Sequence, residues 1–239
     1  MKILAIETSG LVSSVALAED DSIIAEFSTN FKMTHSVTLM PMIENMLNIL
    51  KISIKNVELI AVSKGPGSFT GLRIGSSTAK GIAMALNIPI ASVPTLEAMA
   101  LNIERTDCLI CPMIDARRKQ SYTNLYEYKN DKIIELYKDD VLDVKEIVDR
   151  IKKHNKKVIF LGDGFLVNKK EIEELMGNTF WTSAKSQNRM QRASSVAVLG
   201  FQYFKENRLD NHLEHEPVYL RKSQAEREYD EKNAGNFLA

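Results

Sequence analysis

Apolar and polar positions along the first hundred residues predict three strands, followed by alternating helices and strands. Short apolar runs bounded by turn-prone residues are typical of strands, and apolar positions every three to four residues are typical of helices. The expected strands cover residues 2–7, 13–18, 22–28, 59–63 and 89–92. The expected helices cover residues 36–50, 71–86 and 95–102. The first three strands, joined by short turns, predict an antiparallel meander.

The second half of the chain repeats this order of elements. Its expected strands cover residues 108–114, 120–128, 132–137, 157–161 and 178–182, and its expected helices cover residues 143–154, 167–176 and 194–204. Tyr122, Tyr126 and Tyr128 fall on one face of the second of these strands, since side chains alternate along a strand. We therefore expect two lobes, at residues 1–104 and 105–222, and a charged tail at residues 223–239.

The duplicated order predicts the fold class. Strand-strand-strand-helix-strand-helix-strand-helix (βββαβαβα), read twice, is the α/β architecture of the two-lobed actin-like (ASKHA), ribonuclease-H-like superfamily. Proteins of that superfamily bind nucleotide in the cleft between the lobes. This is an analogy between folds, so function has to be argued from particular residues.

The charge balance argues against a basic field over the whole protein. Among 239 residues, 31 are Lys or Arg and 31 are Asp or Glu, so we expect any work on RNA to go through a partner. No apolar run has the length that spans a membrane, and Glu7 comes too early for a signal peptide. Two cysteines and no export signal favour a cytoplasmic protein.

The segment at residues 65–75, Gly-Pro-Gly-Ser-Phe-Thr-Gly-Leu-Arg-Ile-Gly, poses the main question. It opens the 71–86 helix, whose unpaired N–H groups and dipole favour an anion. However, it lacks the Lys-Ser/Thr ending of a Walker-type loop. The alternatives are a tight turn with close helix packing, and a docking surface for another helix. Small residues recur every four positions on one helix face, at Gly71, Gly75, Ala79 and Ala83.

The expected helix at residues 36–50 is apolar around nearly its whole circumference. A surface helix normally shows one apolar stripe, so this one has to be covered on a second side, and its methionines suit an adaptable interface. We expect it to pack, with the small-residue face, against helices of another chain; the alternative is that the second lobe buries the excess. The expected partner interface comprises Leu39, Met42, Ile43, Met46, Gly71, Arg73, Gly75, Ala79 and Ala83.

Candidate nucleotide-binding residues follow strands in both halves. Glu7 ends the first strand, where actin-like proteins place a phosphate-contacting hairpin, and Asp115 is its counterpart in the second half. Residues 116–118, Ala-Arg-Arg, replace the glycines of that hairpin, so their side chains are expected to fill or reshape the cleft. Gly162 and Gly164 lie where a turn would contact adenosine, and a plain turn explains them about as well.

The cysteines and histidines predict no metal site and no catalytic set. Cys108 and Cys111 lie within a strand with no second pair to complete a zinc site, which favours buried structural cysteines. His212 and His215 are expected to form a surface pair in a linker, and His35 to serve capping or packing at a helix entry. Spacing alone assembles no Ser-His-Asp set.

Five passages together resemble the TsaB (YeaZ) family, which is required for threonylcarbamoyladenosine in tRNA. They are residues 3–9, His35-Ser36 with residues 39–41, 65–75, 115–118 and 216–221. The glycine string is highly specific, whereas Ile-Glu-Thr-Ser alone is shared with the related catalytic subunit TsaD. TsaD carries a paired-histidine metal motif in its first lobe, and this chain has only His35 there.

The resemblance implies a non-catalytic actin-like subunit without a cofactor of its own. It would pair with TsaD through the first-lobe helices, and with the ATPase TsaE it would form the complex that transfers threonylcarbamoyl to the adenosine next to the anticodon. The tRNAs concerned read codons that begin with A. ATP or ADP would bind only at a joint face of the complex, and tRNA only indirectly. In isolation, such proteins form homodimers through the same surface.

Two other functions remain open. One is an autonomous nucleotide-dependent enzyme that uses Glu7, Asp115 and the turn at residues 162–164, and the other is a glycoprotease-like peptidase that acts on its partner. On the docking hypothesis, Gly75→Leu abolishes partner binding while the isolated chain still folds.

Overall fold

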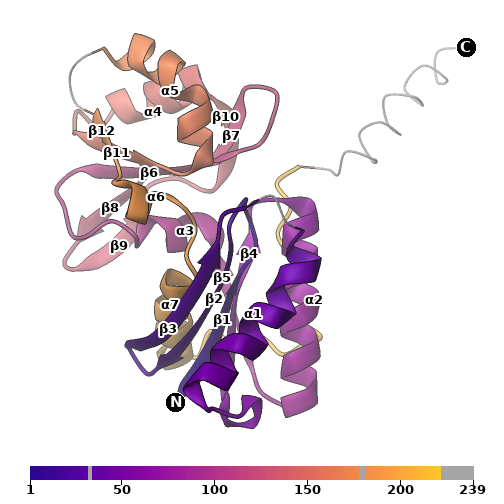
Figure 1. The fold of residues 1–239 in the computed structure, drawn as a ribbon. Helices are drawn as coiled ribbons and strands as arrows, with labels where there is room; N and C mark the ends of the chain where they lie inside the picture. Colours follow the sequence, from indigo (N-terminus) through magenta and orange to yellow (C-terminus); the bar gives the residue numbers. More distant parts are fainter. Residues whose placement is uncertain (32–33, 178–180, 222–239) are drawn as a thin grey trace, which may run out of the picture.

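The computed structural model describes residues 1–31, 34–177 and 181–221, which form two α/β lobes (Figure 1). The first lobe is built on a sheet of strand order β3-β2-β1-β4-β5. Its strands are β1 (Lys2–Glu7), β2 (Ser13–Glu19), β3 (Ser22–Thr29), β4 (Leu59–Gly65) and β5 (Ile90–Pro94). The first three strands form the predicted antiparallel meander, β4 pairs in parallel with β1, and β5 pairs in parallel with β4.

Helices cover both faces of the first sheet. Helices α1 (His35–Leu50) and α2 (Phe69–Leu86) pack on one face, and α7 (Ala193–Lys205) packs on the other. A short 3-10 helix (Ile54–Asn56) precedes β4. Because strands β1 and β4 are apolar on both faces, the sheet needs a helix layer on each side. The expectation that residues 105–222 form one lobe is therefore wrong for α7, which returns to the first sheet.

The second lobe is built on a sheet of strand order β10-β7-β6-β11-β12, to which β8 and β9 are attached. Its strands are β6 (Leu109–Asp115), β7 (Gln120–Thr123), β8 (Tyr126–Lys129), β9 (Lys132–Glu135), β10 (Asp140–Asp143), β11 (Val158–Leu161) and β12 (Trp181–Ser183). Residues 178–180 of the expected last strand, and the expected tail at 223–239, lie outside the described residues.

The single strand expected at residues 120–128 is two strands. The break falls at Asn124, whose Oδ1 accepts a hydrogen bond from the Leu125 N–H and whose Nδ2 donates to Asp139. The three tyrosines nevertheless contact one core: Tyr126 is buried in it, and Tyr122 and Tyr128 pack against it.

Helices α4 (Val144–Lys152) and α5 (Asp163–Met176) cover the outer face of the second sheet, and the short α6 (Ser186–Arg189) leads towards α7. Helix α3 (Thr95–Ala100) ends the first half of the chain, yet its Leu96 and Met99 pack against the second sheet. Helices α3 and α7 thus join the two halves of the chain. They contact each other; α3 also contacts β6 of the second sheet, and α7 contacts β1 and β2 of the first sheet.

The small-residue face of α2 packs against the chain's own first strand. A Cβ at Gly75 would overlap Thr8 Oγ1, and one at Gly71 would overlap the Thr8 carbonyl oxygen. Ala79 and Ala83 are fully buried in the core between the sheet, α1 and α2. The prediction that this face docks a partner helix is therefore wrong, and the alternative of a turn with close helix packing is confirmed.

Helix α1 divides into a buried and an exposed apolar face. Leu39, Ile43 and Met46, expected in a partner interface, are buried in the first-lobe core, so that part of the prediction is also wrong. Met42 is half-buried, and Arg73 on α2 is exposed. The apolar side chains that α1 and α2 do leave exposed are Val37, Met40, Ile49 and Met84.

Replacing Gly75 by Ala is expected to lower the free energy of unfolding of the isolated chain by about 2 kcal/mol, because the added methyl group overlaps Thr8. Gly81 on the same helix is the matched control, since nothing lies within 4 Å of its added Cβ. Gly81→Ala should raise stability by about 0.5–1 kcal/mol through helix propensity. Urea unfolding checks both values, and equal effects of the two substitutions would contradict the assigned packing.

Candidate functional site: the inter-lobe cleft

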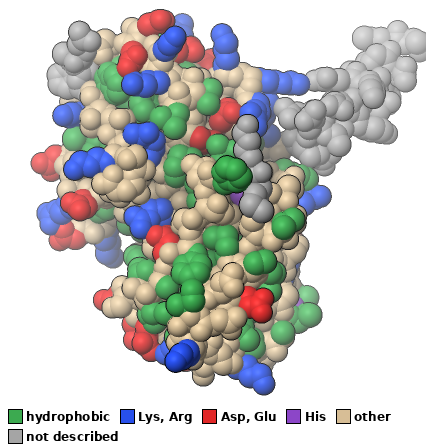
Figure 2. All heavy atoms as spheres, viewed as in Figure 1, with side chains coloured by type: hydrophobic (Ala, Val, Ile, Leu, Met, Phe, Trp, Pro, Cys, Tyr) green, Lys and Arg blue, Asp and Glu red, His purple; other side chains and the backbone are tan. Residues whose placement is uncertain are grey.

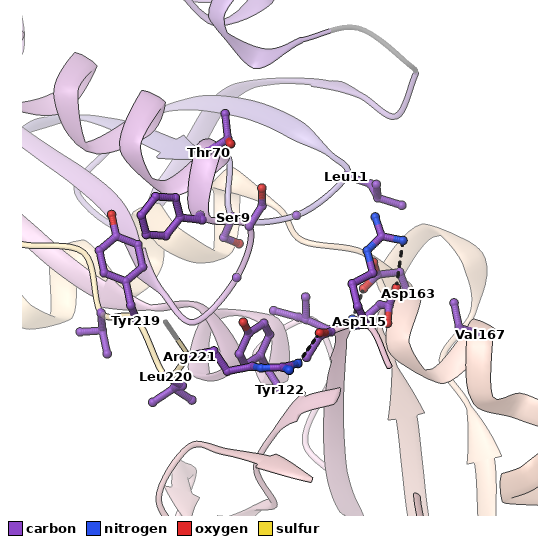
Figure 3. Close-up of a pocket in the computed structure, with 18 residues that line it drawn as sticks. Ser9, Leu11, Thr70, Asp115, Tyr122, Asp163, Val167, Tyr219, Leu220 and Arg221 are labelled. Carbon is purple, nitrogen blue, oxygen red and sulfur yellow. Dashed lines mark hydrogen bonds and ion pairs between the residues drawn. The ribbon is translucent and has the colours of Figure 1, made fainter. Parts of the chain in front are cut away.

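A cavity of about 570 Å³ lies between the two lobes, and we call it the inter-lobe cleft. It is lined by the ends of strands, the first turns of two helices, and a C-terminal segment (Figure 3). The lining residues are 9–11 and 67–70 of the first lobe, 114–117, Tyr122, Asp163 and Val167 of the second lobe, and 218–221. Carboxyl ends of strands and helix N-termini meet here, as is common in ligand-binding α/β proteins.

Glu7 lies beneath the first-lobe side of the cleft and is almost completely buried. Its Oε1 accepts hydrogen bonds from the Ser9 N–H (2.6 Å) and the Ser9 hydroxyl (2.5 Å). Its Oε2 is buried without a hydrogen-bond partner in the described structure. Burial raises the pKa of the Glu7 carboxyl from 4.5 to about 7, and the hydrogen bonds from Ser9 oppose that rise.

The glycine stretch brings the start of α2 against the turn that follows β1. Ser68 donates its N–H to the Ser9 carbonyl (2.6 Å), and a Cβ at Gly67 would overlap that same oxygen. The Ser68 hydroxyl caps the helix by accepting from the Gly71 N–H (3.3 Å). Gly67 therefore serves a close backbone approach, while Phe69 and Thr70 line the cleft.

The second-lobe side carries a turn with unusual backbone geometry. Arg117, Arg118 and Lys119 have φ values of 65°, 54° and 59°, all in the left-handed region. Asp115 accepts a hydrogen bond from the Arg117 N–H (2.9 Å), and Gln120 closes the turn by donating to the Arg117 carbonyl (3.1 Å). The side chain of Arg117 is 84% exposed and lines the cleft with Ala116, so Arg117 borders the cleft without filling it.

Asp163 is the first residue of α5 and lies next to Asp115 on the second-lobe side of the cleft. Its Oδ1 accepts from the backbone N–H groups of Asp115 (3.3 Å) and Gly164 (3.0 Å). Burial raises the pKa of Asp163, and the nearby Asp115 charge adds to the rise. A Cβ at Gly162, whose φ is +96°, would overlap the Met113 carbonyl, and one at Gly164 would press on the same backbone. Packing against β6 thus accounts for both glycines.

A C-terminal segment at residues 215–221, which we call the strap, closes one side of the cleft. Val218 donates its N–H to the Lys64 carbonyl (2.6 Å), and Arg221 donates from Nη1 to the Ala116 carbonyl (2.6 Å). The strap therefore contacts the first lobe at β4 and the second lobe at the turn after β6.

His215 anchors the strap in the first lobe and is completely buried. Its Nδ1 lies 2.6 Å from the Ser92 hydroxyl and its Nε2 lies 2.9 Å from the Ser76 hydroxyl; Ser92 also donates to Asp210. Burial lowers the pKa of His215 to about 4. The prediction of a surface pair with His212 is therefore wrong for His215.

Other candidate residues have structural partners. His35 Nε2 lies 2.9 Å from the Gly10 carbonyl oxygen, between α1 and the turn after β1. Cys111 is buried and Cys108 is half-buried, and both are free thiols. The structure thus brings Asp115 and the turn around Gly162 to the cleft and places Glu7 just beneath it. Residues 216–221 of the strap carry part of the family resemblance, but no periodicity predicts their place in the cleft, because an extended segment is held there by long-range contacts.

Comparison with known proteins identifies the family. The family model described as "TsaD: tRNA N6-adenosine threonylcarbamoyltransferase" matches residues 23–229. A Bacillus subtilis protein described as "tRNA threonylcarbamoyladenosine biosynthesis protein TsaB" is 38% identical over 95% of this chain and 96% of its own length. The chain belongs to the TsaB family. It is therefore a protein of tRNA threonylcarbamoyladenosine biosynthesis, as the resemblance in its motifs predicted.

Solved structures confirm the predicted actin-like fold. YeaZ from Pseudomonas aeruginosa aligns with a TM-score of 0.79 at 23% identity, covering 92% of this chain and 99% of that one. Component A of the (R)-2-hydroxyglutaryl-CoA dehydratase of Acidaminococcus fermentans aligns with a TM-score of 0.50 at 10% identity, covering 84% and 98%. At these identities the likeness shows the fold alone.

The described residues show neither a metal-binding cluster nor a membrane-spanning helix. Residues 1–31, 34–177 and 181–221 contain no group of three or more His, Cys, Asp or Glu side chains that is arranged to hold a metal ion. None of the helices in those ranges is long and apolar enough to cross a bilayer.

Glu7 makes this TsaB-family protein less stable as the pH rises. A raised carboxyl pKa means that the folded chain binds the Glu7 proton more tightly than the unfolded chain, so its contribution is present near pH 4.5 and is lost by about pH 7. Between pH 4.5 and 7, the free energy of unfolding of the wild type should fall by about 3 kcal/mol relative to that of Glu7→Gln.

Urea unfolding at several pH values measures this difference. His215, whose lowered pKa destabilises the folded chain as the pH falls from about 6.5 to 4, contributes equally to both proteins and cancels. Glu44→Gln, on the exposed side of α1, is the control and should show a flat difference. A flat difference for Glu7→Gln as well would contradict the assignment.

Proposed function

We propose that this chain is the non-catalytic scaffold and activator subunit of a cytoplasmic complex with a TsaD-type transferase and a TsaE-type ATPase. The complex transfers a threonylcarbamoyl group to the adenosine next to the anticodon of tRNAs that read codons beginning with A. The observation that carries the proposal is the exposed apolar surface of α1 and α2, on a chain that matches a TsaB protein over nearly its full length.

The docking surface is what remains of these helices after the first-lobe core has formed. Val37 and Met40 on α1 are 60% and 51% exposed, Ile49 is 69% exposed, and Met84 on α2 is 62% exposed. Figure 2 shows hydrophobic side chains scattered over the first-lobe face on which α1 lies. Exposed apolar side chains on two adjacent helices suit a protein interface, and methionines adapt to different partners.

The state of the cleft supports a role without chemistry of its own. Ser9 is engaged with Glu7, Asp115 caps the Arg117 turn, and Asp163 accepts from two backbone N–H groups. These polar side chains hold the two lobes in shape and are committed to internal bonds. ATP or ADP would then bind at a joint face of the assembled complex.

The autonomous enzyme is the alternative to exclude by experiment. Calorimetry of the isolated chain with magnesium-ATP should detect no binding tighter than about micromolar, which corresponds to about −8 kcal/mol. Tight binding together with turnover would overturn the scaffold proposal. Cleavage of a purified TsaD-type partner, followed by mass spectrometry, tests the peptidase alternative in the same way.

Met40→Glu is expected to weaken co-purification with the TsaD-type partner at least tenfold, because it places a charge in the apolar docking surface. The same substitution should shift any homodimer towards monomer in sedimentation. Since Met40 is exposed, the isolated chain should keep its melting temperature. Ile134→Glu, an exposed apolar side chain on β9 of the second lobe, is the matched control. Equal loss of partner binding in both variants would contradict the assigned surface.

A further inference from the structure

An aromatic and cationic stack lies at the mouth of the inter-lobe cleft. The rings of Phe69 and Tyr219 pack with centroids 4.6 Å apart. The Arg73 guanidinium lies 4.0 Å over the Phe69 ring and donates from Nε to the Tyr219 hydroxyl (3.4 Å). Tyr219 remains 39% exposed and lines the cavity, so part of its ring is open to a planar ligand (Figure 3).

The opposite side of the same cavity presents positive charge on a strained turn. Arg117, Arg118 and Lys119 are exposed and occupy three successive left-handed backbone positions, where glycine or asparagine normally serves a plain turn. Non-glycine residues in this region cost free energy and gather at ligand-binding sites. Of these three residues, Arg117 lines the cavity, as does Arg221 of the strap.

The charges at the cleft mouth favour an anionic ligand despite the neutral balance of the whole chain. Arg117 and Arg221 line the cavity together with Asp115 and Asp163, and Arg73 adds a further cation beside it through its contacts with Phe69 and Tyr219. Asp115 is paired with Arg117 at 3.5 Å, and the raised pKa of Asp163 reflects its burial. A volume of about 570 Å³ suits a small part of a polymer, such as one or two nucleotides.

We propose that the mouth of the inter-lobe cleft binds single-stranded RNA, with a base stacked on Tyr219 and the neighbouring phosphates against Arg117 and Arg221. Stacking on aromatic rings beside arginines is how proteins hold unpaired bases, which a duplex does not offer. The inference rests on the proposed function in one respect: the RNA supplied in the cell would be the tRNA of the complex, contacted directly by this subunit.

The test is fluorescence anisotropy of the full chain with a labelled RNA stem-loop, against a blunt RNA duplex of equal length. The loop RNA should bind at least tenfold more tightly than the duplex. Arg117→Ala should weaken loop binding about fivefold and reduce the salt slope by about 0.7, as expected for one lost phosphate contact on a single strand. Tyr219→Ala should weaken it about tenfold, and Tyr219→Phe should restore most of the affinity.

Matched controls separate the site from general effects of charge and aromatic area. Arg105→Ala removes an exposed cation that pairs with Asp131 and does not line the cleft, and Phe204→Ala removes an exposed ring on α7. Both should leave affinity within about twofold of the wild type. Ultraviolet crosslinking to the loop RNA should modify the peptide that contains Tyr219.

Several outcomes overturn the proposal. One is equal binding of duplex and loop RNA, and another is an equal effect of Arg117→Ala and Arg105→Ala. A third is displacement of the RNA by AMP at the concentration at which the loop RNA itself competes, because that would indicate a mononucleotide site. Co-purification with the TsaD-type partner is measured for the same variants. If the wild-type chain co-purifies with the partner but does not bind the loop RNA, this inference alone is rejected, whereas failure of the wild type to co-purify rejects the proposed function.

Discussion

The close approach of α2 to the end of β1 is the constraint on which the rest of the structure depends. Thr8 donates from its hydroxyl to the Gly71 carbonyl (2.8 Å), and Gly71 and Gly75 leave no room for a side chain against Thr8. This contact fixes the helix on the sheet and sets Ser68 against Ser9 at the floor of the cleft. A methyl group at either glycine would push the helix outwards and disturb the packed core as well as the cleft, because packed interiors transmit such displacements.

The same contact decides which surface of the first lobe is left for a partner. Because α2 lies on β1 and α1 lies beside α2, Leu39, Ile43 and Met46 are buried in the first-lobe core. An apolar helix surface then persists on the outside, where Val37, Met40 and Ile49 face away from the sheet. The apolar residues around the circumference of α1 therefore have two roles. One group is buried in the core of this chain, and a partner would bury the other.

Local periodicity predicted the order of elements in the first half of the chain and the actin-like fold, because each strand and helix carries its own pattern. In the second half it missed β10 and α6 and merged β7 with β8. It predicted Asp115 and the turn at Gly162 as cleft residues for the same reason: both follow strands that end at one edge. It could not decide whether the small face of α2 meets a strand or a partner, since both readings require the same glycines. Periodicity also could not predict which sheet α7 covers, because its apolar face would suit either one. The structure shows that α7 covers the face of the first sheet that contains Ile3 and Ala5.

The strap is the side of the cleft that local patterns could not predict. Residues 215–221 have no repeating pattern, and their position depends on contacts over more than a hundred residues: Ser76 and Ser92 hold His215, Lys64 holds Val218, and Ala116 holds Arg221. These contacts exist only after α7 has returned the chain to the first lobe. The aromatic ring of Tyr219 reaches Phe69 by that route alone. The chemistry of the cleft mouth is therefore a property of chain topology, in which the last described residues complete a site begun by the first strand.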